Sequence, residues 1–126
     1  MTDHTPLIDR YIAAWNETDT TRRRDLIART YTESACYIDP VVKGDGHRGI
    51  DAMIAAVQER FPGHAFRRTS DVEAHNDRVR FRWELAPAKG PPVVAGTDFG
   101  VLAENGARIA AVTGFFDHVA AQASGS

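Results

Sequence analysis

The chain of 126 residues is long enough for one domain that buries roughly two-thirds of its unfolded surface around a single core. Its formal net charge of -2 gives no general attraction to nucleic acid or to an acidic membrane. No window approaches the roughly 18 apolar residues of a membrane span, and residues 1–10 carry acids and a proline where a signal peptide needs an apolar run. We therefore expect a cytoplasmic protein that binds neither nucleic acid nor membrane. The single cysteine, Cys36, allows no internal disulfide, and its apolar surroundings predict a small core residue rather than a reactive thiol.

The first predicted helix starts at Thr5 and Pro6, where a hydroxyl cap precedes a proline at the first helical position. Apolar side chains then recur at helical spacing and form one stripe: Ile8, Tyr11, Ile12 and Trp15. The stripe includes a tyrosine, whose hydroxyl needs a polar partner if it is buried.

Two more helices are predicted before the chain turns to strands. The second is capped within residues 19–21 and runs to about Tyr31, and the arginines at 22–24 are expected on a solvated face. The third runs from Ile50 to Phe61 with apolar residues at helical spacing, and the pair Pro62-Gly63 stops it.

A short apolar strand between the second and third helices ends at Asp39, directly before Pro40. Proline cannot extend a strand and holds the preceding residue in extended geometry, so Asp39 should sit where the strand opens onto a loop. There it either faces a cavity or simply starts a turn. The loop 41–49 contains the pattern G-x-G-x-x-G, but four residues separate the strand from the first glycine and no alternating strand-helix pattern follows. We therefore reject a dinucleotide site and expect a flexible rim loop from which His47 or Arg48 touches a ligand.

From residue 66 onward the chain reads as four antiparallel strands. Residues 66–74 are extended, and 78–86 alternate clearly, with Val79, Phe81, Trp83 and Leu85 on one face. The last two strands, 93–103 and 108–118, are joined by a tight turn at Asn105-Gly106. Both are apolar on their two faces, and a second copy of the sheet is the simplest cover for the outer face, which predicts a homodimer. The order of elements predicts an α+β fold with the helices packed on one face of a curved sheet.

Asp98 is the second acid of interest. It shares one face of the strand 93–103 with apolar residues and has a glycine two positions away on each side, Gly96 and Gly100. The missing side chains leave room for either a bend or a ligand pocket. If this face meets the helices, Asp98 looks into the same interior as Tyr11 and Asp39; otherwise it bonds to a neighbouring strand or loop. Because burial raises the pKa of a carboxyl, the more enclosed acid could stay neutral and donate a hydrogen bond while the other takes a proton.

The sequence lacks the residue patterns that other catalytic or binding chemistries require. The five histidines show no ligand spacing for zinc or iron, so no metal site is predicted. There is no G-x-S-x-G elbow and no phosphate-binding loop, and no cofactor is expected. Arginines between residues 67 and 82 are interspersed with acids, which indicates solvent-facing strand positions rather than a nucleic-acid surface.

Several short motifs together resemble a known family. They are Tyr11-Ile12-Ala13-Ala14-Trp15 with Asp19, Tyr31, Ile38-Asp39-Pro40, Gly49-Ile50, Thr97-Asp98-Phe99 and the stretch 106–116. Through the order and spacing of these motifs, the chain from Tyr11 to His118 resembles the fold of nuclear transport factor 2. Within that fold it resembles the SnoaL-like polyketide cyclases and ketosteroid isomerases. The resemblance implies a single NTF2-like domain over residues 1–119: a cone in which three N-terminal helices pack in the concave face of a curved, mainly antiparallel sheet. Residues 120–126 are expected to form a flexible tail.

The resemblance also implies roles for particular residues. Asp39 would be the base that moves a proton next to a carbonyl, and Tyr11 and Asp98 would be the oxyanion donors. The other expected pocket residues are Trp15, Tyr31, His47, Val57, Phe61, Trp83, Gly96, Gly100 and Phe116. The function implied is isomerisation, cyclisation or dehydration of a small apolar carbonyl compound. The isomerases tend to carry a tyrosine near Val57, and the charged loop 43–48 differs from a steroid-binding rim, which argues against a steroid. The alternative is a binding or interaction module of the same fold without enzymatic activity.

Overall fold

The computed structural model describes residues 3–120. Its described part contains three α-helices, seven strands and one short 3-10 turn. In chain order they are α1 Thr5–Asn16, α2 Thr20–Thr30, β1 Tyr31–Ile38, β2 Lys43–Asp45, α3 Gly46–Arg60, β3 His64–Arg68, β4 Glu73–His75, β5 Arg78–Pro87, β6 Val94–Ala103, η1 Glu104–Gly106 and β7 Arg108–Val119. The α+β class predicted from the sequence is confirmed.

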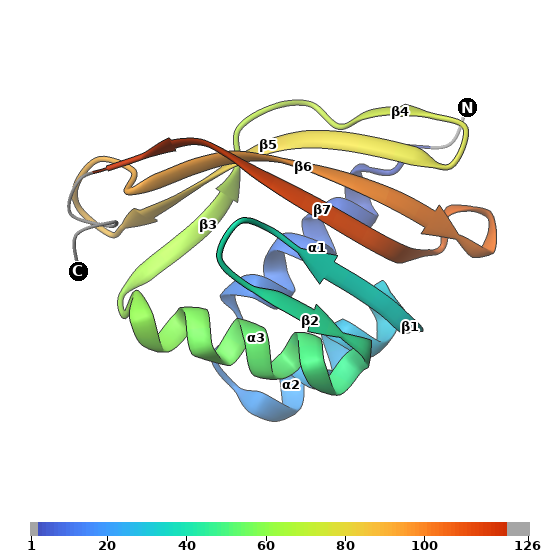
Figure 1. The fold of residues 1–126 in the computed structure, drawn as a ribbon, viewed down its shortest axis with the longest axis horizontal. Coiled ribbons are helices and arrows are strands. Elements are labelled where there is room, and N and C mark those ends of the chain that lie inside the picture. The colour runs from blue at the N-terminus through green and yellow to red at the C-terminus, as the bar shows by residue number, and fades with distance from the viewer. Residues whose placement is uncertain (1–2, 121–126) are drawn as a thin grey trace.

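The strands form one curved sheet in the order β2-β1-β7-β6-β5-β3, with β4 also paired to β5. Every neighbouring pair is antiparallel except β1 and β7, which run parallel. Figure 1 shows the long strands β5, β6 and β7 arching over the helices, with the β1–β2 hairpin and α3 below them. The expected packing of three helices against a curved, mainly antiparallel sheet is therefore confirmed.

The helices bury the predicted faces, with two corrections. In α1 the buried stripe includes Ile8, Tyr11 and Trp15, but His4 rather than Thr5 is the N-cap and no side chain caps the helix. In α2 the Asp19 carboxylate accepts the backbone N–H of Arg22 at 2.9 Å, as its predicted capping place suggests. The arginine run at 22–24 is not wholly solvated.

The exception within that run is Arg23, which is only 5% exposed. Its Nε donates to Asp51 Oδ1 of α3 at 2.6 Å, while the exposed Arg24 reaches Asp51 Oδ2 at 3.1 Å. A buried guanidinium needs such a carboxylate to compensate its charge, so this pair joins α2 to α3.

The strands follow the predicted alternation, and this periodicity explains one of three errors. The four predicted inward residues of β5 are all buried: Val79, Phe81, Trp83 and Leu85. In β1, Ala35 and Tyr37 point inward, so Cys36 between them must face outward; it is exposed, and the prediction of a core cysteine is wrong. The predicted single strand 66–74 is divided into β3 and β4, which both pair with β5. The expected loop 41–49 contains β2 and the first turn of α3.

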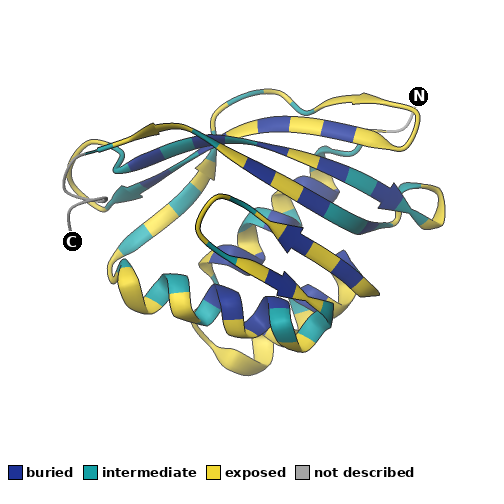
Figure 2. Ribbon diagram, viewed as in Figure 1, coloured by how far each residue is buried: buried dark blue, intermediate teal, exposed yellow. Residues whose placement is uncertain are grey.

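Two phenylalanines are exposed on the outer face of the sheet. Phe99 of β6 and Phe115 of β7 are 42% and 53% exposed, and their rings meet edge to face at 5.9 Å between centroids. Figure 2 shows buried residues alternating with half-buried or exposed ones along these strands. The homodimer predicted from this face stays a prediction.

The last strand, β7, ends at Val119. The Ala120 amide donates to the Val93 carbonyl at 2.8 Å, which ties the first residue of the predicted tail to the strand edge. The rest of that tail, 121–126, lies outside the described residues. Among the helices of the described part, none is long and apolar enough to cross a membrane.

Candidate active site

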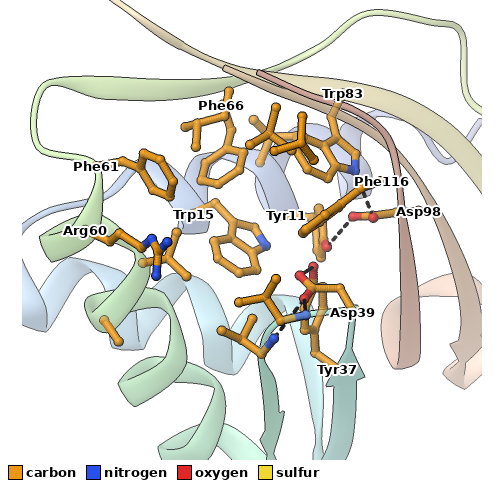
Figure 3. A pocket seen from close by; sticks show the side chains of 18 residues that line it. Tyr11, Trp15, Tyr37, Asp39, Arg60, Phe61, Phe66, Trp83, Asp98 and Phe116 are labelled. Carbon is orange, nitrogen blue, oxygen red and sulfur yellow. Dashed lines mark hydrogen bonds between the residues drawn. The ribbon is translucent and has the colours of Figure 1, made fainter. Parts of the chain in front are cut away.

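A cavity of about 580 Å³ opens between the helices and the concave face of the sheet. This volume lies within the range of small-molecule sites, and its walls are mostly apolar. Tyr11, Asp39 and Asp98 all line it, as the sequence predicted. So do five of the other expected pocket residues, Trp15, Val57, Phe61, Trp83 and Phe116 (Figure 3).

The register of the sheet brings the two acids together. Asp98 of β6 pairs directly with Gly114 of β7, and on the other side of β7 the last pair with β1 is Ile38 with Thr113. Asp39 follows Ile38 and therefore comes next to Gly114. A Cβ added to Gly114 would lie 2.9 Å from Asp98 Oδ1, 3.1 Å from Asp39 Cβ and 3.2 Å from Tyr37 Oη. The missing side chain of Gly114 thus leaves the space in which both acids and a phenol meet.

Asp98 is 3% exposed and accepts one hydrogen bond on each oxygen. Tyr11 Oη lies 2.7 Å from Oδ2, and Trp83 Nε1 donates to Oδ1 at 2.8 Å. Burial raises the pKa of the Asp98 carboxyl to about 6, the two hydrogen bonds lower it, and the charge of Asp39 raises it. Around pH 6 the Asp98 carboxyl therefore changes between an ionised and a neutral form.

The hydrogen bonds fix where the proton of neutral Asp98 resides. The indole N–H of Trp83 is a donor only, so Oδ1 must remain an acceptor and the proton belongs on Oδ2. Oδ2–H then donates to the Tyr11 oxygen, and the Tyr11 O–H is released towards the cavity. Burial, followed by the charge of Asp98, raises the pKa of Tyr11 well above its ordinary value, so this phenol stays protonated and serves as a donor.

Asp39 is half-buried at the end of β1 and is held from two sides. The backbone amides of Val41 and Val42 donate to Oδ1 at 2.8 and 2.9 Å, and Tyr37 Oη donates to Oδ2 at 2.7 Å. Asp39 therefore both starts a turn and lines the cavity; the two readings of its position hold together. A carboxylate offers about four lone pairs, two on each oxygen. Both on Oδ1 are occupied, which leaves Oδ2 as the atom that can take a proton.

Four expected pocket residues do not line this cavity. The room beside Gly96 is filled by the indole of Trp83, since an added Cβ would come within 2.5 Å of it. The room beside Gly100 is filled by Val79, 2.8 Å from an added Cβ. His47 lies in the first turn of α3, where its Nε2 is 2.8 Å from the Tyr31 carbonyl oxygen.

Tyr31 is the fourth of these residues and lies in the core behind Tyr11, with 6.0 Å between the two ring centroids. Its hydroxyl has no hydrogen-bond partner within residues 3–120. Burial raises the pKa of Tyr31 well above its ordinary value, so it is protonated.

Two polar residues of the cavity were missed by sequence reasoning, Tyr37 and Arg60. Tyr37 stands two residues before Asp39, and the period of a strand places it on the same face, which was a usable signal. Burial, followed by the charge of Asp98, raises its pKa well above the ordinary value, so it donates to Asp39 rather than ionising. Arg60 lies in the last turn of α3 and carried no such signal. Within residues 3–120, no three His, Cys, Asp or Glu side chains gather as metal ligands.

The fold and the site together define a class of small α+β domains in which an apolar cavity lies between helices and a mainly antiparallel sheet and carries two acids in its lining. The chain belongs to the SnoaL-like family: the model of the SnoaL-like domain matches residues 8–112. The resemblance inferred from the sequence is thereby confirmed. Among the curated proteins, none matches the chain.

Solved structures agree with this assignment. A proposed isomerase of the SnoaL-like family from Agrobacterium tumefaciens str. C58 is 41% identical, with a TM-score of 0.87 over 94% of this chain and 100% of that one. A proposed SnoaL-like polyketide cyclase from Jannaschia sp. CCS1 is 19% identical, with a TM-score of 0.70 over 90% of this chain and 85% of that one. A proposed ketosteroid isomerase from Kribbella flavida DSM 17836 is 16% identical, with a TM-score of 0.67 over 92% and 78%. The last two likenesses show the fold alone.

Proposed function

We propose that the protein is an acid-base enzyme of the isomerase or cyclase type that acts on a small, largely apolar carbonyl compound without a cofactor. The observation that carries the proposal is the meeting of Asp39, Asp98 and Tyr11 at one end of a single apolar cavity. The similarity to a proposed SnoaL-like isomerase at 41% identity supports it.

In the proposed reaction Asp39 Oδ2 takes a proton from the carbon next to the substrate carbonyl. The electron pair of that C–H bond forms a carbon–carbon double bond, and the carbonyl π pair moves onto oxygen to give an enolate. The Tyr11 O–H donates to this oxygen and is itself supported by neutral Asp98, whose Oδ2–H donates to the phenol oxygen. Return of the proton to another carbon completes an isomerisation. In a cyclisation the enolate carbon attacks a second carbonyl, and the alkoxide formed there takes the proton held by Asp39.

Proton exchange tests this proposal without knowledge of the product. Small cyclic ketones such as 2-tetralone would be incubated with the protein in D₂O, and loss of the α-proton signal followed by NMR. Asp39→Asn should lower the exchange rate by about 10²- to 10⁴-fold, the usual contribution of a general base. Asp45→Asn, which changes an exposed acid outside the cavity, is the matched control and should leave exchange unchanged. Equal exchange in wild type and Asp39→Asn would exclude Asp39 as the base.

One observation favours a second candidate, a non-catalytic small-molecule binder. Three of the four lone pairs of Asp39 are already engaged by Tyr37, Val41 and Val42, which suits a structural carboxylate. A binder would take up a phenol such as 2-naphthol equally well in wild type and Asp39→Asn, and would exchange no ketone protons with either. An enzyme would bind in both cases but exchange protons only with the wild type.

A further inference from the structure

A single cation, Arg60, stands among the residues that line the cavity. It is an exposed residue of the last turn of α3 and lines the cavity next to Phe61. Figure 3 shows Arg60 on the side of Trp15 that faces away from Asp39 and Asp98. The cavity therefore has a positive end and an acidic end, with apolar walls between them.

Arg60 has no acidic partner within residues 3–120, because no hydrogen bond or ion pair forms between its side chain and any of them. Its guanidinium lies over the Phe61 ring, 5.8 Å from the centroid. This contact holds the charge beside the cavity but leaves the planar edge of the guanidinium free. A cation is favourable at the C-terminus of a helix, which explains why a charged residue occupies position 60. That effect does not require the Arg60 side chain to line the cavity.

The chemistry of this charge distribution selects a ligand. A guanidinium presents N–H groups in a fork that matches a carboxylate, and such pairs fix orientation as well as adding affinity. The acids at the other end repel an anion, so a ligand with one anionic group would bind in one direction only. We propose that the substrate is an apolar carbonyl compound that carries a carboxylate at the end remote from the reacting carbonyl, and that Arg60 binds this carboxylate. This inference rests on the proposed function.

The test compares two naphthols of nearly equal shape, 6-hydroxy-2-naphthoic acid and its carboxamide. Both offer the hydroxyl to Tyr11, and they differ only in a negative charge at the far end of the ring system. Binding would be measured by the fluorescence of Trp15 and Trp83, which line the cavity. At about pH 5.5 the naphthoate is ionised, and it should bind about fivefold more tightly than the carboxamide, as expected for an ion pair near the surface.

Arg60→Gln should abolish this preference without changing the affinity for the carboxamide, whereas Arg60→Lys should retain part of it. Arg48→Gln is the matched control, because Arg48 is an exposed arginine of the same helix that does not line the cavity. Equal affinity of the wild type for the two compounds would overturn the inference, as would an equal loss of preference in Arg48→Gln. Because this assay measures binding without turnover, it can fail independently of the proposed function. Loss of the charge preference with proton exchange intact contradicts only the role of Arg60, and loss of proton exchange with the charge preference intact contradicts only the proposed enzyme.

Discussion

Asp98→Asn should make the protein more stable above pH 6 although it alters the proposed site. Burial raises the pKa of this carboxyl from 3.8 to about 6 in the folded state. Since the folded protein then binds the proton more tightly than the unfolded chain, stability falls as the pH rises through this window. The loss of folding stability caused by ionising the buried Asp98 carboxyl is absent below pH 3.8, grows up to about pH 6 and is complete above it. A shift of roughly two units at 1.36 kcal/mol per unit amounts to about 3 kcal/mol.

Asparagine should remove this penalty and keep the hydrogen bonds of the neutral acid. Its amide oxygen can accept the N–H of Trp83, and its amide N–H can donate to the Tyr11 oxygen, in the places that Oδ1 and Oδ2–H occupy. The variant should therefore match the wild type near pH 4 and exceed its free energy of unfolding by about 3 kcal/mol at pH 8.

Urea unfolding at several values between about pH 4 and 8 measures this difference. Asp45→Asn provides the control for the loss of a carboxylate at an exposed position. Parallel stability curves for wild type and Asp98→Asn, or a variant less stable than wild type at pH 8, would refute the reasoning. Asp98 would then have an ordinary pKa in the folded protein, and its role as a neutral donor would have no physical basis.

Three further predictions concern the surroundings of Asp98 and the outer face. Trp83→Phe removes the donor on Asp98 Oδ1 and should lower the free energy of unfolding by about 1–3 kcal/mol at pH 8 and by less at pH 5, as urea unfolding would show. Gly114→Ala places a methyl group 2.9 Å from Asp98 Oδ1 and should abolish 2-naphthol binding measured by fluorescence; unchanged binding would mean that the acids need no such space. Phe115→Arg should convert the predicted homodimer to a monomer in sedimentation velocity, and a monomeric wild type would contradict the dimer.

The sequence predicted the local structure well because each element carries its own signal. The stripe of α1 and the alternation of β5 are periodic patterns that burial imposes on one helix or one strand at a time. The place of Asp39 followed from the proline after it. The apolar neighbours of Asp98 on β6 indicated either an inward direction or a bond to a neighbouring strand, and both occur. These signals need no knowledge of which segments meet in space.

The errors arise where the outcome depends on distant partners. The glycines beside Asp98 do leave room, but Trp83 and Val79 from the neighbouring strand occupy it, and a single strand cannot reveal this. Arg23 appeared to belong to a solvated run because Asp51, its partner in α3, is 28 positions away in the chain. The parallel pairing of β1 with β7, which places Asp39 beside Gly114, joins segments whose separation in sequence gives no local sign of contact.

The meeting of two acids around Gly114 implies that the charge of Asp39 affects the ionisation of Asp98. The charge of Asp39 contributes to the raised pKa of Asp98, after burial as the largest cause. Asp39→Asn should therefore lower the pKa of Asp98 below about 6, because a like charge is removed while burial and the bonds from Tyr11 and Trp83 remain. Carboxyl ¹³C chemical shifts followed by NMR through a pH titration would measure this change, with Asp45→Asn as the control. An Asp98 titration identical in the two proteins would show that the acids do not interact. The charge of Asp39, the proposed base, would then not help to keep Asp98 neutral as the proposed donor.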